Sequence, residues 1–403
     1  MRVLHLFDWY LPSTLSWVSR LLLHLPETDV SVGAPWIVQN QFCRPQIQYH
    51  RFPLQAPGIF DPVSETQFPF WRRMLTRSQR FLPTYPLWLG RHLQHDPPDI
   101  LHAHFGPTGC LYLPLAKKLD RPLVVTFYGF DYQKLLHHRP VFRKKYRELF
   151  AQAARVVAAS PIWQRELEAM GCPSEKIALV RPSPDLKQFP FATRTKHPGR
   201  LQLVQVATFT PKKGHLTTLE AVRLARPDCP NLHLTLAGEL HDPVLTRQVR
   251  AFIRQHQMEH CVTWLDPIDH PQMAAFLARF DAFIHPSQRT PDGDHEAVCV
   301  VLLEAQATGL PVLATRHYDI PDEVQHTQTG FLVAESDAQA LAEAIRTLYN
   351  MGNEPYQVLS HNARAWVEQT FDVQQSARQL HAIYTAIGTQ TAPLKTQNSK
   401  LKI

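Results

Sequence analysis

Glycine is scarce in this chain and proline is abundant, with 15 glycines and 34 prolines among 403 residues. Long hydrophobic runs are missing, because no apolar segment approaches the roughly 18 residues that a membrane-spanning helix needs. The first residues, MRVLHLFDWYLP, lack a charged region followed by the apolar stretch of a signal peptide. These absences exclude an ordinary integral membrane protein and predict a cytoplasmic location.

Disulfide and metal-binding patterns are also missing. The six cysteines are scattered, with no CxxC pair and no metal-like spacing, so free thiols in a reducing compartment are expected. His102 and His104 alternate along one segment, but no third ligand follows at a suitable spacing. We therefore expect no metal site there. The cysteines are Cys43, Cys110, Cys172, Cys229, Cys261 and Cys299.

The composition that remains, 44% hydrophobic and 19% charged, is that of an ordinary globular protein. Short apolar segments such as RVLHLF, DILHAHF and LVVTFYG in the first half, and LQLVQVATF, LHLTLAG and PVLAT in the second, alternate with helix-compatible stretches. This alternation predicts an α/β protein with parallel sheets covered on both faces. We expect one Rossmann-like domain over residues 1–185, a linker rich in proline and basic residues over 186–200, and a second Rossmann-like domain over 201–368.

The most informative stretch is DGDHEAVCVVLLEAQATGLPVLAT, residues 292–315. It predicts a helix over 297–308, with Asp292 and Asp294 complementing its N-terminus. Gly309, followed by a proline two residues later, marks the end of the helix, and a buried strand follows.

Two glutamates frame this predicted helix. Glu296 stands at its mouth and Glu304 lies eight residues further along, roughly 12 Å at the helical rise. That is about the distance from the sugar to the ribose in an extended nucleotide-sugar, and a helix N-terminus suits a diphosphate. By spacing alone, the commoner explanation of such a pair is one capping acid and one solvated acid on an amphipathic helix.

The sequence around these glutamates resembles the donor-binding half of the retaining glycosyltransferases of family 4. FDAFIHPSQRTPDGDHEAVCVVLLEAQATGLPVLAT, followed by IPDEVQHTQTGFLVAESDAQALAEAI, matches the family's elements in order over about 65 residues. The resemblance implies the GT-B fold, two Rossmann-like domains facing across a cleft. It also implies that residues 369–387 form a helix returning to the first domain, with a frayed tail over 388–403.

The same resemblance assigns roles along this stretch. Glu296 orients the hydroxyls of the donor sugar as a catalytic residue, and Glu304 binds the ribose hydroxyls. Ala297, Val298 and Cys299, between the two acids, belong to the donor site. Ala297 stands where the family has glycine.

The loop VATFTPKKGHLTTLEA resembles the family's phosphate-binding segment. Lys213, before Gly214, matches the lysine that grips the donor diphosphate and serves as the second catalytic residue. The family's arginine falls on Thr208, so half of the usual clamp is absent, and Lys212 is a candidate to compensate. A solvated loop lysine is the plain alternative for Lys213.

The first half resembles a subgroup that builds bacterial surface and exported polysaccharides, through HAHFGPTG and TFYGFD. This places His104, Tyr128, Gly129 and Asp131 in the cleft on the acceptor side. Tyr128 replaces the histidine that usually contacts the donor sugar; a phenol forms hydrogen bonds but is no base near neutral pH. Further departures are Asp319, in place of a glycine, and Asp322 as the acid of the I-P-E element.

Positive charge suggests a further partner. The net charge is +7, and two basic clusters that carry aromatic residues, Phe70–Phe81 and His137–Leu149, lie in the acceptor half. Solvated helix faces are the commoner outcome, but such faces also bind anionic membranes. Nucleic acid is not expected, because no recognition motif accompanies the charge.

Together these features predict a metal-independent hexosyltransferase that uses a UDP- or GDP-linked donor and needs no cofactor. Its acceptor is expected to be a growing glycan, in particular a lipid-linked one, at the inner face of the plasma membrane. Two alternatives stay open: a sugar-nucleotide epimerase of the same architecture, and a non-catalytic subunit of a polysaccharide assembly system. The departures at Thr208, Tyr128 and Ala297 favour the latter.

Overall fold

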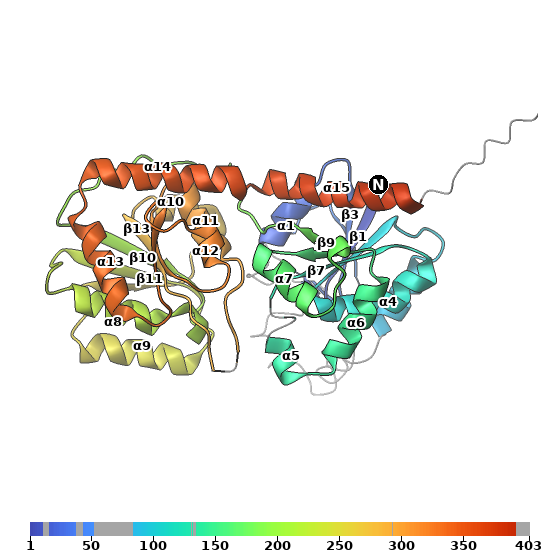
Figure 1. The fold of residues 1–403 in the computed structure, drawn as a ribbon, viewed down its shortest axis with the longest axis horizontal. Helices are drawn as coiled ribbons and strands as arrows, with labels where there is room; N and C mark the ends of the chain where they lie inside the picture. Colours follow the sequence, from blue (N-terminus) through green and yellow to red (C-terminus); the bar gives the residue numbers. More distant parts are fainter. Residues whose placement is uncertain are drawn as a thin grey trace, which may run out of the picture.

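The computed structural model describes residues 1–10, 16–37, 43–51, 84–129, 131, 134–291 and 293–391. Two parallel sheets, each covered by helices, form two units that lie side by side (Figure 1). This arrangement confirms the predicted GT-B architecture.

The first sheet has seven strands in the order β5-β3-β1-β6-β7-β8-β9, all joined in parallel. β1 pairs with β3 on one side and with β6 on the other, so the order in which strands are added to the sheet reverses between β1 and β6. Ligands bind at such a switch point. The strands are β1 (Arg2–Leu6), β3 (Asp29–Gly33), β5 (Gln48–His50), β6 (Ile100–His104), β7 (Leu123–Phe127), β8 (Arg155–Ala158) and β9 (Ile177–Leu179), and the short strands β2 (Trp9–Tyr10) and β4 (Trp36–Ile37) pair separately. The helices are α1 (Ser16–Leu23), α3 (Thr84–His92), α4 (Gly106–Leu119), α5 (Lys134–His138), α6 (Phe142–Gln152), α7 (Pro161–Ala169) and the 3-10 turn η3 (Ser174–Lys176).

The second sheet has six parallel strands in the order β12-β11-β10-β13-β14-β15, with its switch point between β10 and β13. The strands are β10 (Leu201–Val206), β11 (Leu232–Ala237), β12 (Val262–Leu265), β13 (Ala282–His285), β14 (Val312–Thr315) and β15 (Gly330–Val333). The helices are η4 (Pro211–Lys213), α8 (His215–Ala225), α9 (Pro243–Gln255), η5 (His270–Gln272), α10 (Met273–Leu277), α11 (Val300–Ala307), α12 (Ile320–Glu323), α13 (Ala338–Asn350) and α14 (Asn353–Thr370).

The last helix, α15 (Val373–Thr391), crosses back to the first domain and runs on from α14 along one side of the molecule (Figure 1). Leu380 and Tyr384 are buried in the core that also contains residues of β1 and α1. The Tyr384 hydroxyl lies 2.5 Å from Nδ1 of His102 in β6. Residues 388–391, expected in the frayed tail, continue α15, and the rest of that tail lies outside the described residues.

The segment 186–200 has no helix or strand and is anchored to the second domain. The buried Arg194 guanidinium donates to the carbonyl oxygens of Thr308 and Phe280, and the buried Lys196 ammonium donates to those of His197 and Arg200. Basic side chains of this segment therefore satisfy backbone carbonyls in the interior.

Candidate donor site between the two domains

The helix expected over 297–308 is shorter in the structure, because α11 begins at Val300. Tertiary contacts hold the preceding backbone in another conformation: the Glu296 N–H donates to Nε2 of His317, and the Cys299 N–H donates to Oε1 of Glu323. The carboxylate of Asp294 pairs with Lys212 at 3.3 Å, on the loop before α11. Asp292, the other acid predicted to complement the helix N-terminus, lies outside the described residues. The axial distance estimated for Glu296 and Glu304 therefore does not apply, because only part of the chain between them is helical.

Glu296 and Lys213 form a buried ion pair in which the Lys213 ammonium donates to Oε2 of the glutamate. Burial disfavours the charge on each, but their mutual attraction dominates; it raises the pKa of Lys213 and holds the pKa of Glu296 well below its usual range. Gly214, which follows Lys213, has φ 67°, and a Cβ there would lie 2.0 Å from the carbonyl oxygen of Pro286. Only glycine therefore allows η4 to present Lys213 beside the end of β13.

Histidines that the sequence analysis did not single out surround Glu296. Nε2 of His285 lies 3.8 Å from Oε2 of Glu296 and 3.3 Å from the Cys299 sulfur. His317 accepts from the Glu296 N–H through Nε2, so its proton sits on Nδ1, which lies 2.7 Å from Oε1 of Glu335. Burial lowers the pKa of His285 and of His317, which favours their neutral forms. Lys213 is therefore the main cationic partner of Glu296.

The remaining donor-site candidates lie on the segments that carry Glu296 and Lys213. Ala297 and Val298 pack against the core of the first domain, and Val298 also contacts that of the second. Cys299 is buried at the start of α11, and burial raises the pKa of its thiol. Thr208 follows β10, where its carbonyl oxygen accepts from the Thr210 N–H at 2.8 Å.

Glu304, on α11, forms a second buried ion pair, and its partner comes from the other domain. Nη2 of Arg20, on α1, lies 3.1 Å from Oε1 of Glu304, and Nε2 of His270 lies 3.0 Å from the same oxygen. Arg20 and His270 are also hydrogen-bonded to each other. Neither Arg20 nor His270 was predicted, because their positions in the sequence give no sign that they meet.

Two departures from the family pattern, Asp319 and Asp322, make contacts between the domains. The Asp319 carboxylate accepts from the Ser160 hydroxyl and from the Trp163 indole N–H, both on the first domain at the start of α7. Burial raises the pKa of Asp319 to about 6. Asp322 lies 3.1 Å from a guanidinium nitrogen of Arg181.

On the first-domain side, the loop after β7 lies against the segment that follows Glu296. Gly129 has φ 107°, and a Cβ there would lie 3.2 Å from the Cβ of Ala297. The buried Asp131 accepts from the backbone N–H groups of Gly106, Tyr128 and Gly129, and burial raises its pKa to about 6. Asp131 thus shapes this loop. The Tyr128 hydroxyl lies 2.6 Å from Nδ1 of His104 and so is already engaged within the domain.

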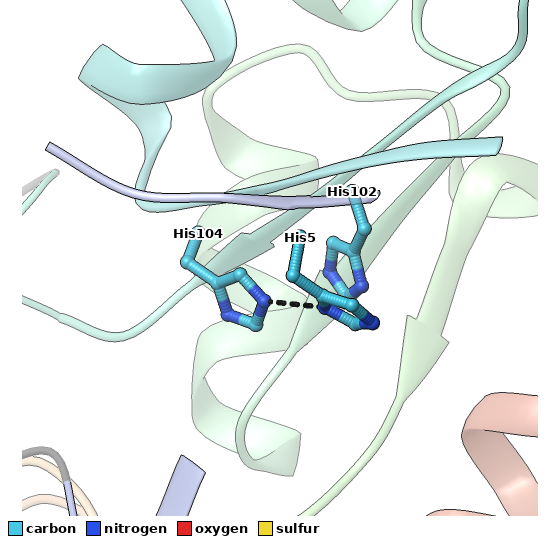
Figure 2. A group of neighbouring side chains, drawn as sticks. All are labelled: His5, His102 and His104. Carbon is cyan, nitrogen blue, oxygen red and sulfur yellow. Dashed lines mark hydrogen bonds between the residues drawn. The ribbon is translucent and has the colours of Figure 1, made fainter. Parts of the chain in front are cut away.

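His104 belongs to a buried group of three histidines (Figure 2). Parallel pairing of β1 with β6 puts His5 opposite His102, a third imidazole that sequence spacing did not reveal. Nδ1 of His5 lies 2.9 Å from Nε2 of His104, whereas the nitrogens of His102 face the hydroxyls of Thr126 and Tyr384.

The imidazoles of His102 and His104 stack with centroids 4.4 Å apart and planes 20° from parallel, and one ring nitrogen from each of the three histidines lies within 4.8 Å of the other two. Burial lowers the pKa of His102 to about 3 and lowers those of His5 and His104 as well. We interpret the group as a hydrogen-bonded network of neutral rings.

Two parallel sheets, each covered by helices and each with a switch point, define a protein of the GT-B fold. Comparison with known proteins agrees: a model of glycosyl transferases group 1 matches residues 189–366, and a glycosyl transferase 4-like domain matches residues 40–183. The chain belongs to this glycosyltransferase family.

Similar proteins include the amylovoran biosynthesis glycosyltransferase AmsK of Erwinia amylovora, which is 32% identical over 83% of this chain and 80% of its own length. The putative colanic acid biosynthesis glycosyltransferase WcaL of Escherichia coli K12 is 30% identical over 72% of this chain and 71% of its own. Among solved structures, Anabaena Alr3699/HepE in complex with UDP is 18% identical, covers 96% of this chain and all (100%) of its own, and has a TM-score of 0.73.

Within the part of the chain that the structure describes, no helix is both long enough and apolar enough to cross a membrane.

Glu323 provides a pH-dependent test of this packing. Burial raises the pKa of Glu323 well above its ordinary value of 4.5, and its Oε2 has no hydrogen-bond partner among the described residues. A raised pKa contributes stability that is complete below pH 4.5 and is lost as the pH rises through the folded-state value. Glu323→Gln keeps an oxygen that accepts from the Cys299 N–H but carries no charge. We therefore expect the urea midpoint of unfolding of the variant to rise relative to that of the wild-type protein as the pH increases from 5 to 8.

Urea denaturation at several pH values measures this difference. Glu368→Gln, at a side chain that is 52% exposed and paired with Arg364, is the matched control. If the difference in unfolding midpoint between Glu323→Gln and the wild-type protein stayed constant with pH, the raised pKa of the buried Glu323 carboxyl would be wrong.

Proposed function

We propose that the protein is a retaining glycosyltransferase that moves a hexose from a nucleoside diphosphate donor to a growing exopolysaccharide, with a lipid-linked glycan as acceptor. The observation that carries this proposal is the buried Lys213–Glu296 pair at the carboxyl ends of β10 and β13, opposite the first domain. The names of the amylovoran and colanic acid relatives support the class of product, and the UDP-glucose complex of Alr3699/HepE supports a nucleotide-sugar donor.

In this proposal, each site residue binds a different part of the donor. Glu296 orients the hydroxyls of the sugar, Glu304 binds the ribose, and Lys213 holds the diphosphate between them. The bond from the sugar's anomeric carbon to the diphosphate oxygen breaks, and a bond to the acceptor oxygen forms on the same face. The acceptor's proton passes to the departing phosphate oxygen. Lys213 stabilises the negative charge that develops there, so the mechanism needs no metal ion.

Lys212 has a different part. Its ammonium lies 3.3 Å from Oδ1 of Asp294 and 3.2 Å from the carbonyl oxygen of His295. These contacts hold it on the loop before Glu296, so we assign it to shaping the donor loop rather than to replacing the family arginine at position 208.

An anionic membrane is the proposed location of the acceptor. The surface formed by α5 and α6 exposes a row of basic side chains and Val141, which is 60% exposed. Basic groups beside an apolar side chain suit the headgroup region of an anionic bilayer. The second basic cluster, at residues 70–81, lies outside the described residues. The exposed basic residues of this surface are His137, His138, Arg139, Arg143, Lys144, Lys145 and Arg147.

A panel of radiolabelled UDP- and GDP-sugars tests the function directly. We expect slow hydrolysis of one donor, or its transfer to a lipid-linked glycan extract, at a rate that excess EDTA leaves unchanged. An epimerised nucleotide-sugar would identify an epimerase, and the absence of turnover and binding with every donor would identify a non-catalytic subunit. Activity lost in EDTA and restored by Mn²⁺ or Mg²⁺ would overturn the proposed mechanism.

Three substitutions separate the roles of the donor-site residues. Lys213→Ala removes a charge that matters most as the diphosphate departs, so kcat should fall by roughly 2–4 kcal/mol of barrier. Glu304→Gln weakens ribose binding before and during reaction, so mainly the donor KM should rise. Glu296→Gln should lower kcat, because the sugar is misplaced.

Steady-state kinetics and calorimetric donor binding measure these effects. Glu220→Gln, in a surface pair with Arg223 on the helix that follows Lys213, is the control. If Lys213→Ala left kcat intact while Glu304→Gln abolished it, the order of diphosphate and ribose along the site would be wrong.

Charge reversal tests the membrane surface. Arg143→Glu with Lys144→Glu should reduce co-sedimentation with vesicles of phosphatidylglycerol and phosphatidylcholine, and high salt should release the wild-type protein. Arg247→Glu with Arg254→Glu, at exposed positions of α9 in the second domain, makes the same change in net charge elsewhere. Equal binding of wild type to pure phosphatidylcholine vesicles, or equal losses for the two double variants, would contradict the proposal.

A further inference from the structure

Arg20 is a buried cation to which the proposed mechanism assigns no role. Its side chain is 6% exposed, although α1 belongs to the first domain and both of its named partners, Glu304 and His270, belong to the second. A guanidinium withdrawn from water between two domains is costly unless its donors are used.

The hydrogen bonds of Arg20 do not use all of these donors. Its two terminal nitrogens contact Glu304 and His270, but its Nε–H is buried and has no partner among the residues that the structure describes. A planar guanidinium offers five N–H donors in a fork that matches the oxygens of a phosphate. The unused donor points to an anionic ligand that completes this site.

Arg20 and Lys213 are arranged alike around the donor site. Each cation rests on one of the two donor-binding acids, Lys213 on Glu296 and Arg20 on Glu304. Under the proposed function, the sugar hydroxyls take Glu296 and the ribose hydroxyls take Glu304. The diphosphate lies between sugar and ribose, so both cations are adjacent to it when the donor binds.

We propose that Arg20 is the second cation of the diphosphate clamp, supplied from the first domain in place of the arginine that is missing at Thr208. Without donor, Arg20 rests on Glu304; with donor, its guanidinium contacts the diphosphate while Glu304 binds the ribose. Because α1 carries Arg20, the diphosphate joins the two domains. The proposal rests on the assignment of the glutamates in the proposed function.

Calorimetric titration with UDP or GDP, whichever the wild-type protein binds, and with the matching nucleoside tests this role. A hydrogen bond to a charged group contributes about 1.5–3 kcal/mol, or roughly tenfold to hundredfold in Kd. Arg20→Leu should therefore weaken nucleoside diphosphate binding by about tenfold to hundredfold and leave nucleoside binding unchanged. Arg20→Lys keeps the charge beside Glu304 and should show a smaller loss; it decides the matter if Arg20→Leu does not fold.

Arg181→Gln is the matched control, because Arg181 also pairs across the domain boundary, with Asp322, but outside the two donor-site ion pairs. Equal losses in Arg181→Gln and the Arg20 variants would show a general effect on domain contact and overturn the proposal. So would nucleoside diphosphate binding that is unchanged or tighter in the Arg20 variants, since tighter binding means that Arg20 only competes for Glu304. A wild-type protein that binds neither UDP nor GDP would instead overturn the proposed function, and this inference with it.

Discussion

The cleft depends on one electrostatic constraint: a charge buried between the two domains needs an opposite charge beside it. Lys213 pairs with Glu296 and Arg20 pairs with Glu304, so both acids that we propose to bind the donor already have a cationic partner in the structure. Under the proposed function, the donor replaces these contacts with contacts of its own. The affinity for the donor is therefore set by the free-energy difference between the ion pairs and the contacts that replace them. Truncating either cation also leaves the paired carboxylate buried without a partner, which is destabilising.

The same constraint gives a structural reason for departures from the family pattern. Asp319 replaces a glycine, and its carboxylate accepts hydrogen bonds from Ser160 and from the Trp163 indole on the opposite domain. The Trp163 ring in turn stacks on Tyr318, with centroids 5.6 Å apart. These contacts hold the first domain against the loops that carry the donor-site residues. The replacement of glycine by Asp319 therefore adds contacts between the domains and removes no side chain from the site.

The fold and the family were predictable from the sequence, because alternating strands and an ordered set of motifs both extend over long stretches. The start of α11 was not, because helix propensity at residues 297–299 yields to tertiary hydrogen bonds from Glu296 and Cys299 to His317 and Glu323. Arg20 and His5 were missed for another reason. Their partners are distant in sequence, and only the strand register and the meeting of the two domains bring them together.

Burial determines the protonation state and the hydrogen bonding of the first-domain residues His104 and Tyr128. His104 is neutral because burial lowers its pKa, and the Tyr128 hydroxyl is hydrogen-bonded to it, so neither offers a base to an incoming acceptor. The proposed mechanism therefore sends the acceptor's proton to the departing phosphate oxygen, which must carry its negative charge until that proton arrives. A cation at each end of the diphosphate meets this need, since preorganised positive charge in a dry site stabilises a leaving group without reorganisation. Under the proposed mechanism, the two buried ion pairs share one role: each acid holds its cation in a desolvated position before the donor binds.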